Sequence, residues 1–469
     1  ILFVNDLNAL TVDLFLYDLC EGLGRPRENA EAVKQRFWQR LYSNTNGNKP
    51  ANIRETDAYF ADYVELLDGK RYEVFSDASI DGYYYPVQLG DTYALQVDSS
   101  GDKARAQQPA APHTVKAIST DILENRIRHQ HGELGESWLV WGQLSSPHQD
   151  AEATAKACYS ALANAQTSEQ TLSWQRNYAG KGSFDGAVVY ELQQLDTFLD
   201  GKNSNHHVLI FLFPAGRAES EVKATMSKLN RHLIRLFHNR SKVLWLYEES
   251  RKLKGNLKEA SDAADPLVTQ LSRHVQSPRL NLKLLQQHLA DALRTAHIYE
   301  NQLNYLREKE PEISTNLTSY CKRTATMADI DASADLAFLG DFVTLTKEKY
   351  IGQIRADVVA FEGARKPLSA SIQTVQGIIE IERTQNERVL NRTVAIAGVG
   401  ISAASLAASS IGDRADSLVQ AWHPAPTDQP APVANLLLSA TLILTVSLAV
   451  GILAAWITAV LIDRKANSS

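Results

Sequence analysis

"TVAIAGVGISAASLAASSIG", residues Thr393 to Gly412, contains no charge and consists mostly of Ala, Gly and Ser. About 20 residues in a helix are enough to cross about 30 Å of hydrocarbon. Small residues gain little from hydrocarbon, so a soluble or interfacial helix is the alternative to a membrane span. The same small residues allow close contacts between membrane helices. We predict a first transmembrane helix over residues 393–412, stabilised by a partner helix.

A second uncharged segment follows at Leu436 to Ile462, LLLSATLILTVSLAVGILAAWITAVLI. It is rich in Leu, Ile and Val, and buried helices of soluble proteins rarely stay apolar on every face for so long. The segment therefore predicts a second transmembrane helix over residues 435–462. Residues 413–434 become a Pro-rich loop between the two spans, and residues 463–469 become a short tail.

The orientation of this hairpin follows from the Lys and Arg residues beside it. They are Arg383, Arg388 and Arg392 before the first span, Arg414 between the spans, and Arg464 and Lys465 after the second. Both chain ends are therefore expected in the cytoplasm and the loop outside. We predict a multi-pass protein of the cytoplasmic (inner) membrane.

The composition of the 469-residue chain narrows the remaining choices. A net charge of −6 gives no global basic field, so nucleic acid is not expected as a partner. Cys20, Cys158 and Cys321 lack the spacing of a disulfide framework or a zinc site, which favours a reducing compartment. The opening ILFVNDLNAL lacks a basic region and contains Asp6, so we do not expect a signal peptide.

Residues 1–250 are predicted to form a cytoplasmic α/β domain. Apolar patterns predict strands over residues 10–16, 137–144, 186–193, 207–213 and 243–247, and helices over residues 29–43, 150–164 and 222–237. The last helix lies between two predicted strands, which indicates a βαβ unit with parallel pairing. Residues 71–97 are predicted to form a hairpin, and residues 98–112 a polar loop.

Residues 251–392 are predicted to form long coiled-coil-like stalk helices. Two apolar seams are spaced three or four residues apart: Leu282, Leu285, Leu289, Ala292, Ala296, Tyr299, Leu303 and Leu306, and then Ile354, Phe361, Leu368, Ile372, Val375 and Ile379. Pro311 is expected to interrupt the first seam, Ser333 to cap the second helix, and Pro367 to kink it. Without a break, the second helix would extend about 90 Å to the first span.

Several motifs resemble chemical sites without meeting their spacing. Gly180 to Ser183, GKGS, lacks the Gly that a phosphate-binding loop requires upstream, so we interpret it as a hairpin turn. His129, His131 and Glu133, and the pair His206 and His207, could bind a metal, but polar loop histidines are more often solvated. No nucleophile site is recognisable, so we predict no enzyme and identify no cofactor.

The first predicted span has one small, hydroxyl-bearing face. Its members, the pore-lining candidates, are Ala395, Gly398, Ser402, Ser405 and Ser409. This face either packs against another helix or lines a pore formed by several subunits. Asp413 and Asp416 follow the span, where carboxylates either concentrate cations at a pore mouth or are simply solvated at a helix end.

This arrangement resembles the CorA-like superfamily of two-helix metal ion transporters: a cytoplasmic α/β domain, a long stalk helix, two spans and a basic tail. The resemblance implies a homopentamer with the first spans around its axis, ion transport, and a divalent cation as possible cargo. The family's Gly-Met-Asn motif is absent, because Ser409 to Asp416 read SSIGDRAD. Magnesium selectivity is therefore not implied.

Arg388 and Asn391 continue the stripe toward the stalk and are gate candidates. A ring of Arg388 would oppose cations, so the stalk is rotated, the path is closed or tolerates anions, or there is no path. The first functional hypothesis is an oligomeric channel, transporter or diverged effector regulated by its cytoplasmic domain. The second is a non-conducting scaffold or signalling protein with an oligomerising stalk, and a soluble enzyme with a membrane tail ranks third.

Overall fold

The computed structural model describes residues 6–20, 27–42, 54, 62–76, 80–101, 110, 112–166, 172–194, 206–275 and 282–385, with isolated helical positions at 445, 449, 450, 453 and 457. They divide into two compact units, residues 1–254 with 305–358 and residues 255–304 with 359–469. The predicted span over residues 393–412 and most of the one over residues 435–462 lie outside the described part. Among the helices that are described, none combines the length and apolarity that a membrane crossing needs.

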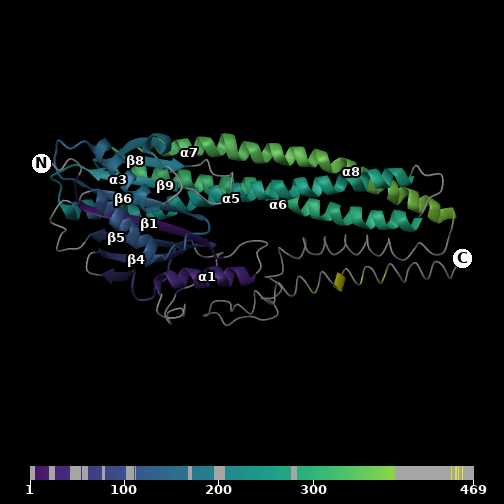
Figure 1. Cartoon of the computed structure of the whole chain (residues 1–469), viewed down its shortest axis with the longest axis horizontal. Helices are drawn as coiled ribbons and strands as arrows, with labels where there is room; N and C mark the ends of the chain where they lie inside the picture. Colours follow the sequence, from purple (N-terminus) through teal and green to yellow (C-terminus); the bar gives the residue numbers. More distant parts are fainter. Residues whose placement is uncertain are drawn as a thin grey trace. The chain divides into compact units, whose positions relative to one another are not determined.

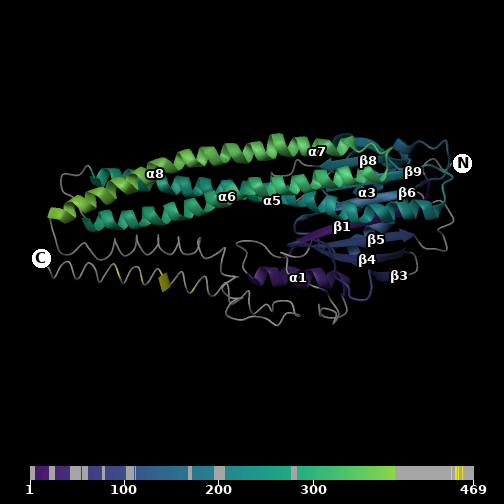
Figure 2. The same ribbon diagram turned by 180° about the vertical axis from the view of Figure 1, so that it is seen from behind.

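The first unit contains a mixed sheet, which the described residues build from nine strands (Figure 1). The strands are β1 (Leu7–Leu19), β2 (Val64–Glu65), β3 (Glu73–Ser76), β4 (Ile80–Leu89), β5 (Thr92–Gly101), β6 (Gly135–Leu144), β7 (Tyr178–Phe184), β8 (Ala187–Gln194) and β9 (His206–Phe213). Their order is β2-β4-β5-β1-β6-β9-β8-β7, and β3 pairs with β4 at one edge (Figure 2). Within this sheet β6 and β9 are parallel, and the other pairs are antiparallel.

Helices cover each face of the sheet. Alternate residues of β1 point to opposite faces, so each face presents its own set of side chains to these helices. Val12, Leu14 and Leu16 share a buried core with Phe37 and Trp38. The helices of the first unit that precede the long ones are α1 (Arg27–Leu41), α2 (His113–Asp121) with the π-turn η1 (Ile122–Arg126), α3 (Ala151–Gln166) and α4 (Trp174–Asn177). The structure confirms the predicted strands over residues 10–16, 137–144, 186–193 and 207–213 and the hairpin. It also confirms the helices predicted over residues 29–43 and 150–164, which are α1 and α3.

The opposite face of β1 packs against the start of α5 (Glu219–Val275). The Phe15 and Phe237 rings lie 5.1 Å apart, and the Tyr17 hydroxyl donates to the Ile234 carbonyl at 2.8 Å. The predicted strand over residues 243–247 is wrong, because this stretch continues α5. Its residues are buried on more than one side, and a short run of that kind does not distinguish a strand from a buried helix. The predicted βαβ unit is therefore also wrong.

In the second unit the two predicted seams pack against each other and against the end of α5. The core residues are Ala264 and Leu271 of α5, Leu285, Leu289 and Ala292 of α6 (Leu282–Ile330), and Leu368, Ile372, Val375 and Ile379 of α8 (Gly352–Gln385). The seams thus face helices of their own chain. Stripes of this spacing are typical of helices that bury one side in a bundle.

Two details of the helical region, at Pro311 and Ser333, differ from expectation. Helix α6 continues through Pro311, where the buried neighbours Leu306, Ile313 and Leu317 maintain the helix through packing. Ser333 caps no long helix, since its backbone N–H and its hydroxyl both donate to Asp331. The helical stretch begins later, with η2 (Ala337–Leu339), α7 (Gly340–Leu345) and the π-turn η3 (Thr346–Ile351), and then continues as α8. Pro367 lies inside α8.

The GKGS motif lies within strand β7 and not at a hairpin turn, which follows at Asp185 and Gly186. Its glycines allow a chain segment from residues 335–338 to cross the strand. A Cβ atom at Gly182 would lie 2.1 Å from the Asp335 carbonyl oxygen, and one at Gly180 would lie 2.5 Å from the Phe338 Cβ. The Ser183 N–H donates to the same Asp335 carbonyl at 2.9 Å. These glycines therefore have a packing role.

We expect Gly182→Ala to lower the free energy of unfolding by about 1–3 kcal/mol, because the added methyl group forces the crossing segment away from β7. The measurement is urea-induced unfolding of the first unit in the detergent-solubilised full chain, and pulse proteolysis monitors the unfolded fraction. Gly101→Ala is the matched control, since a Cβ there meets no atom within 4 Å. Equal stability of the two variants would contradict the close crossing.

Candidate functional site

Three neighbouring strands place two carboxyl groups and a phenol side by side. In the register of the sheet, Tyr83 of β4 lies opposite Asp98 of β5, and Asp98 lies opposite Asp13 of β1. Directly paired residues on adjacent strands point to the same face. All three side chains therefore project to the side of the sheet that α5 covers.

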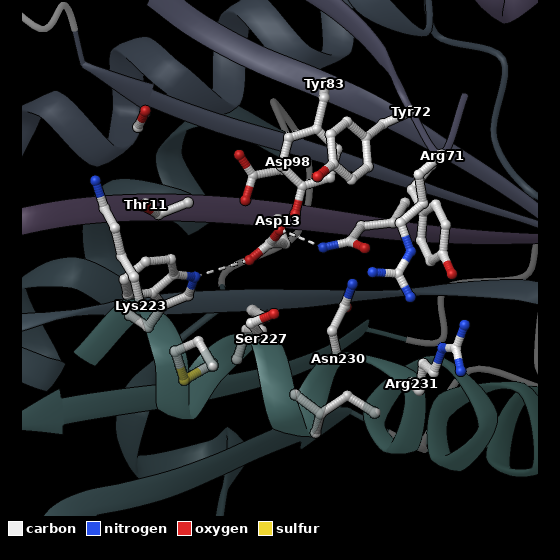
Figure 3. Close-up of a pocket in the computed structure, with 17 residues that line it drawn as sticks. Thr11, Asp13, Arg71, Tyr72, Tyr83, Asp98, Lys223, Ser227, Asn230 and Arg231 are labelled. Atoms are coloured by element: carbon white, nitrogen blue, oxygen red, sulfur yellow. Dashed lines mark hydrogen bonds between the residues drawn. The ribbon is translucent and has the colours of Figure 1, made fainter. Parts of the chain in front are cut away.

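A cavity of about 380 Å³ lies between this face and the first turns of α5. Figure 3 shows Asp13 near its centre, Asp98 and Tyr83 on one side of Asp13, and Ser227 and Asn230 of α5 on the opposite side. The apolar part of the wall is formed by Leu139, Trp141, Met226 and Leu233. The other lining residues carry polar or charged groups, and a cavity in which polar groups converge beside apolar side chains is a candidate small-molecule site.

Asp13 is almost fully buried, and both of its oxygens accept hydrogen bonds. The Gln96 Nε2 donates to Oδ1 at 2.8 Å, and the Trp141 indole donates to Oδ2 at 3.0 Å. Burial raises the pKa of Asp13 to about 6, although these hydrogen bonds oppose the shift. Burial, followed by the adjacent Asp13 charge, holds the pKa of Asp98 well above its ordinary value. The pair therefore retains a proton at a pH where ordinary carboxyl groups are ionised.

The other polar groups of the cavity wall differ in their partners. The Gln96 Oε1 is buried and has no hydrogen-bond partner among the described residues. Lys223 contacts Glu219 at 2.5 Å, outside the carboxyl pair.

A basic cluster lies at another part of the wall, where Arg71 and Arg231 share the carboxylate of Glu65. Arg231 donates to Glu65 at 2.8 Å, Arg71 at 3.1 Å, and the Tyr85 hydroxyl at 2.8 Å. Burial acts to raise the pKa of Glu65, but these hydrogen bonds lower it overall. The Arg231 guanidinium also lies 5.3 Å from the centre of the Tyr63 ring.

A second polar cluster is buried farther along the same face of the sheet. The His207 Nδ1 lies 2.9 Å from the Ser137 hydroxyl, and the His207 Nε2 lies 3.1 Å from Glu191. All three side chains are at most 1% exposed, so this Ser-His-Glu chain has no access to a substrate. Burial raises the pKa of Glu191 to about 7, while the positive charge of Arg240 opposes the shift. We assign this cluster to the core.

The residues considered as possible metal ligands have other partners. His131 contacts Glu136 at 2.8 Å, and the Glu133 N–H donates to Asp18 at 3.1 Å. The interpretation of His207 as a solvated loop residue is wrong, because it is buried on β9. Within the part of the chain that is described, no three His, Cys, Asp or Glu side chains are grouped so as to hold a metal ion.

The predicted membrane site residues all lie outside the described residues. They are the pore-lining candidates Ala395, Gly398, Ser402, Ser405 and Ser409, the pore-mouth candidates Asp413 and Asp416, and the gate candidates Arg388 and Asn391. The cavity, in contrast, was not predicted. The sequence contains one indication of the cavity, the ionisable residue Asp13 in the middle of an otherwise apolar strand. Its partner Asp98 was assigned to a loop. Cross-strand register, which one sequence does not show, is needed to pair them.

Comparison with known proteins adds no relative. No family model matches this chain, and no curated protein or solved structure matches it. The resemblance to CorA-like transporters therefore stays a prediction.

The carboxyl pair gives the stability a definite pH dependence. Since folding raises the pKa of Asp13 from 3.8 to about 6, the folded state binds more protons than the unfolded chain between these values. The free energy of unfolding then decreases as the pH rises through this window and levels off above it. The charged or titratable groups that line the same cavity are Arg71, Tyr72, Tyr83, Tyr85, Asp98, Lys223 and Arg231.

We expect Asp13→Asn to flatten this part of the profile, which urea unfolding of the full chain between pH 4 and pH 7 measures. The comparison must be made with the wild-type chain at each pH. Glu191 contributes with the same sign, and His207, whose pKa is lowered by burial, contributes with the opposite sign. An identical slope in both proteins would contradict the raised pKa of Asp13.

Proposed function

We propose that the chain is a CorA-like integral membrane protein, an oligomeric ion channel, transporter or diverged effector that its N-terminal unit regulates from the cytoplasm. The observation that carries this proposal is the sequence after α8. This helix is described as far as Gln385, and the uncharged residues 393–412 and 436–462 follow within the same chain. Two such segments after a long helix are what a two-span membrane protein requires.

Regulation by the N-terminal unit is supported by the continuity of the helices. Helices α5, α6 and α8 each contribute residues to both compact units. The first unit contains a cavity with a titrating carboxyl pair, which is a means of sensing a ligand or pH. In this proposal, Ser402, Ser405 and Ser409 line the path and Asp413 and Asp416 lie at its mouth. Arg388 and Asn391 then lie at the cytoplasmic entrance.

The alternative is a non-conducting scaffold whose stalk oligomerises. Helices that assemble into coiled coils need an exposed apolar seam. Here Leu289 and Leu368 are buried among helices of one chain, while Val359 is 68% exposed and Ile298 is 50% exposed. Among the described residues of these helices, the exposed large apolar side chains are Ile298, Tyr305, Ile330 and Val359, which are fewer than an interface along the whole stalk needs. The buried seams therefore favour assembly through the membrane segments.

The oligomeric mass in detergent tests both proposals. We expect the full chain to form a homopentamer and to become monomeric when residues 393–462 are replaced by an unrelated single-span anchor. A pentamer that survives this replacement would support the scaffold and its stalk interface. A monomeric full chain would leave the small-residue stripe without a pore to line and would contradict the channel.

A further inference from the structure

The cavity between β1, β4, β5 and α5 contains a carboxyl pair that forms no salt bridge, although the positive charge of Lys223 acts on Asp98 and opposes the rise of its pKa. No salt bridge joins Asp13 or Asp98 to a Lys or Arg within the described part of the chain, whereas Lys223 pairs with Glu219 and both Arg71 and Arg231 pair with Glu65. Buried carboxylates are normally paired with a cation or retain a proton. The pair retains a proton here, as its raised pKa values indicate.

We propose that this cavity binds a small organic amine, with a primary ammonium group against Asp13 and Asp98 and an apolar body in the rest of the cavity. Three acceptor groups border this part of the cavity: the two carboxyl groups and the Gln96 amide, whose Oε1 has no partner among the described residues. A primary ammonium group has three N–H donors. It therefore satisfies several acceptors at once and neutralises the pair.

The apolar part of the cavity wall suits a small apolar or aromatic body. Leu139, Met226 and Leu233 contribute aliphatic surface, and Trp141 contributes an aromatic ring. The Tyr72 and Tyr83 rings lie 5.0 Å apart and also border the cavity. Aromatic faces attract an organic cation. A cavity of about 380 Å³ is near the lower limit for small-molecule sites, which indicates a compact ligand.

A divalent metal ion fits this position less well. Hard divalent cations require about six oxygen ligands, and the described residues bring together no third carboxylate or imidazole here. The three cations of the cavity wall also disfavour a polyamine, because further positive charge would be placed beside Lys223, Arg71 and Arg231.

Isothermal titration calorimetry of the detergent-solubilised full chain tests the proposal with phenethylamine as the probe. The uncharged 2-phenylethanol controls for the apolar body and for partitioning into detergent. Because the alcohol lacks the charged hydrogen-bonding group, we expect it to bind at least about tenfold more weakly. The affinity for phenethylamine should rise between pH 5 and pH 7.5, since the ammonium group displaces the proton of the pair.

Two variants locate the binding site. Asp98→Asn should weaken phenethylamine binding at least about tenfold. Asp81→Asn, on the exposed part of β4, should leave binding unchanged. Because Asp98→Asn could disturb the sheet, Ser227→Leu is a second variant, which fills the cavity from α5 and keeps the carboxyl pair. The thermal midpoint without ligand shows that each variant folds.

The contradicting results are distinct. Equal affinity for phenethylamine and 2-phenylethanol would show an apolar cavity without an ammonium site. Binding of MgCl₂ but not of the amine would show a divalent cation site. Absence of binding by all three probes, or full binding by Asp98→Asn, would also overturn the proposal. Amine binding is measurable whether or not the chain conducts ions, so this test is separate from that of the membrane function.

Discussion

Replacing Arg240 with Met is expected to lower the free energy of unfolding of the first unit by about 3–5 kcal/mol. The Arg240 side chain is about 1% exposed, donates to Gln193 at 2.6 Å, and lies 4.9 Å from the centre of the Phe342 ring. Its charge opposes the burial that raises the pKa of Glu191 to about 7. Without Arg240, a buried carboxyl group loses its nearby positive charge, and Gln193 loses its donor.

The same variant changes the pH dependence in a defined direction. Removal of Arg240 raises the pKa of Glu191 further above that of the unfolded chain. The stability of Arg240→Met should therefore fall over a wider range of rising pH than that of the wild type. Pulse proteolysis in urea at pH 5 and pH 8 measures both the loss of stability and its pH dependence.

Two further variants separate the buried charge from simple loss of packing. Adding Glu191→Gln to Arg240→Met removes the isolated carboxyl group, and we expect it to recover part of the lost stability. Arg355→Met is the matched control, because Arg355 is 65% exposed in its ion pair with Glu310. This replacement should lower the free energy of unfolding by at most about 1 kcal/mol. Equal losses for Arg240→Met and Arg355→Met would contradict the buried cluster.

The second large effect is expected in the second unit, where Leu289→Ala should lower the free energy of unfolding by about 2–5 kcal/mol. Leu289 is 1% exposed and packs in the core that α5, α6 and α8 share. Truncation leaves a cavity between three helices that are held mainly by such contacts. Proteolysis of the full chain in detergent, followed at cleavage sites in residues 255–304, measures this loss.

Ile298→Ala is the matched control, because Ile298 lies on the same helix and is 50% exposed. We expect it to change the stability by no more than about 0.5 kcal/mol. A large loss for Ile298→Ala, together with a concentration-dependent midpoint, would instead show that this exposed face is an interface between chains. A small loss for Leu289→Ala would contradict the three-helix core.

The elements with a clear period were predictable from the sequence. The alternation of Val12, Leu14 and Leu16 identified β1, and the seam through Leu285 and Leu289 identified α6. Residues 243–247 were wrongly assigned to a strand. A short apolar run that is buried on more than one side shows neither the helical nor the strand periodicity, so the sequence does not distinguish the two. Pro311 does not end α6, because tertiary packing outweighs the local preference of one residue.

The candidate cavity was harder to predict than the fold. Asp13 was visible in an apolar strand, yet its partner Asp98 lies far along the chain and meets it through the register of β1 and β5. Strand register depends on the whole sheet and not on the two residues alone. The helix α5 that closes the cavity was predicted only in part, since its continuation was assigned to a strand.

Ion flux into proteoliposomes most directly tests the central claim that the chain is a CorA-like channel or transporter. The purified full chain would be reconstituted with an ion-sensitive dye inside the vesicles and exposed to gradients of monovalent and divalent cations and of chloride. We expect flux of at least one ion, and strong inhibition by Ser402→Leu and Ser405→Leu, which place large apolar side chains on the small-residue stripe. Val399→Leu, on the apolar side of the same segment, should conduct like the wild type. Absence of flux under every gradient, in vesicles that contain correctly assembled protein, would contradict the claim.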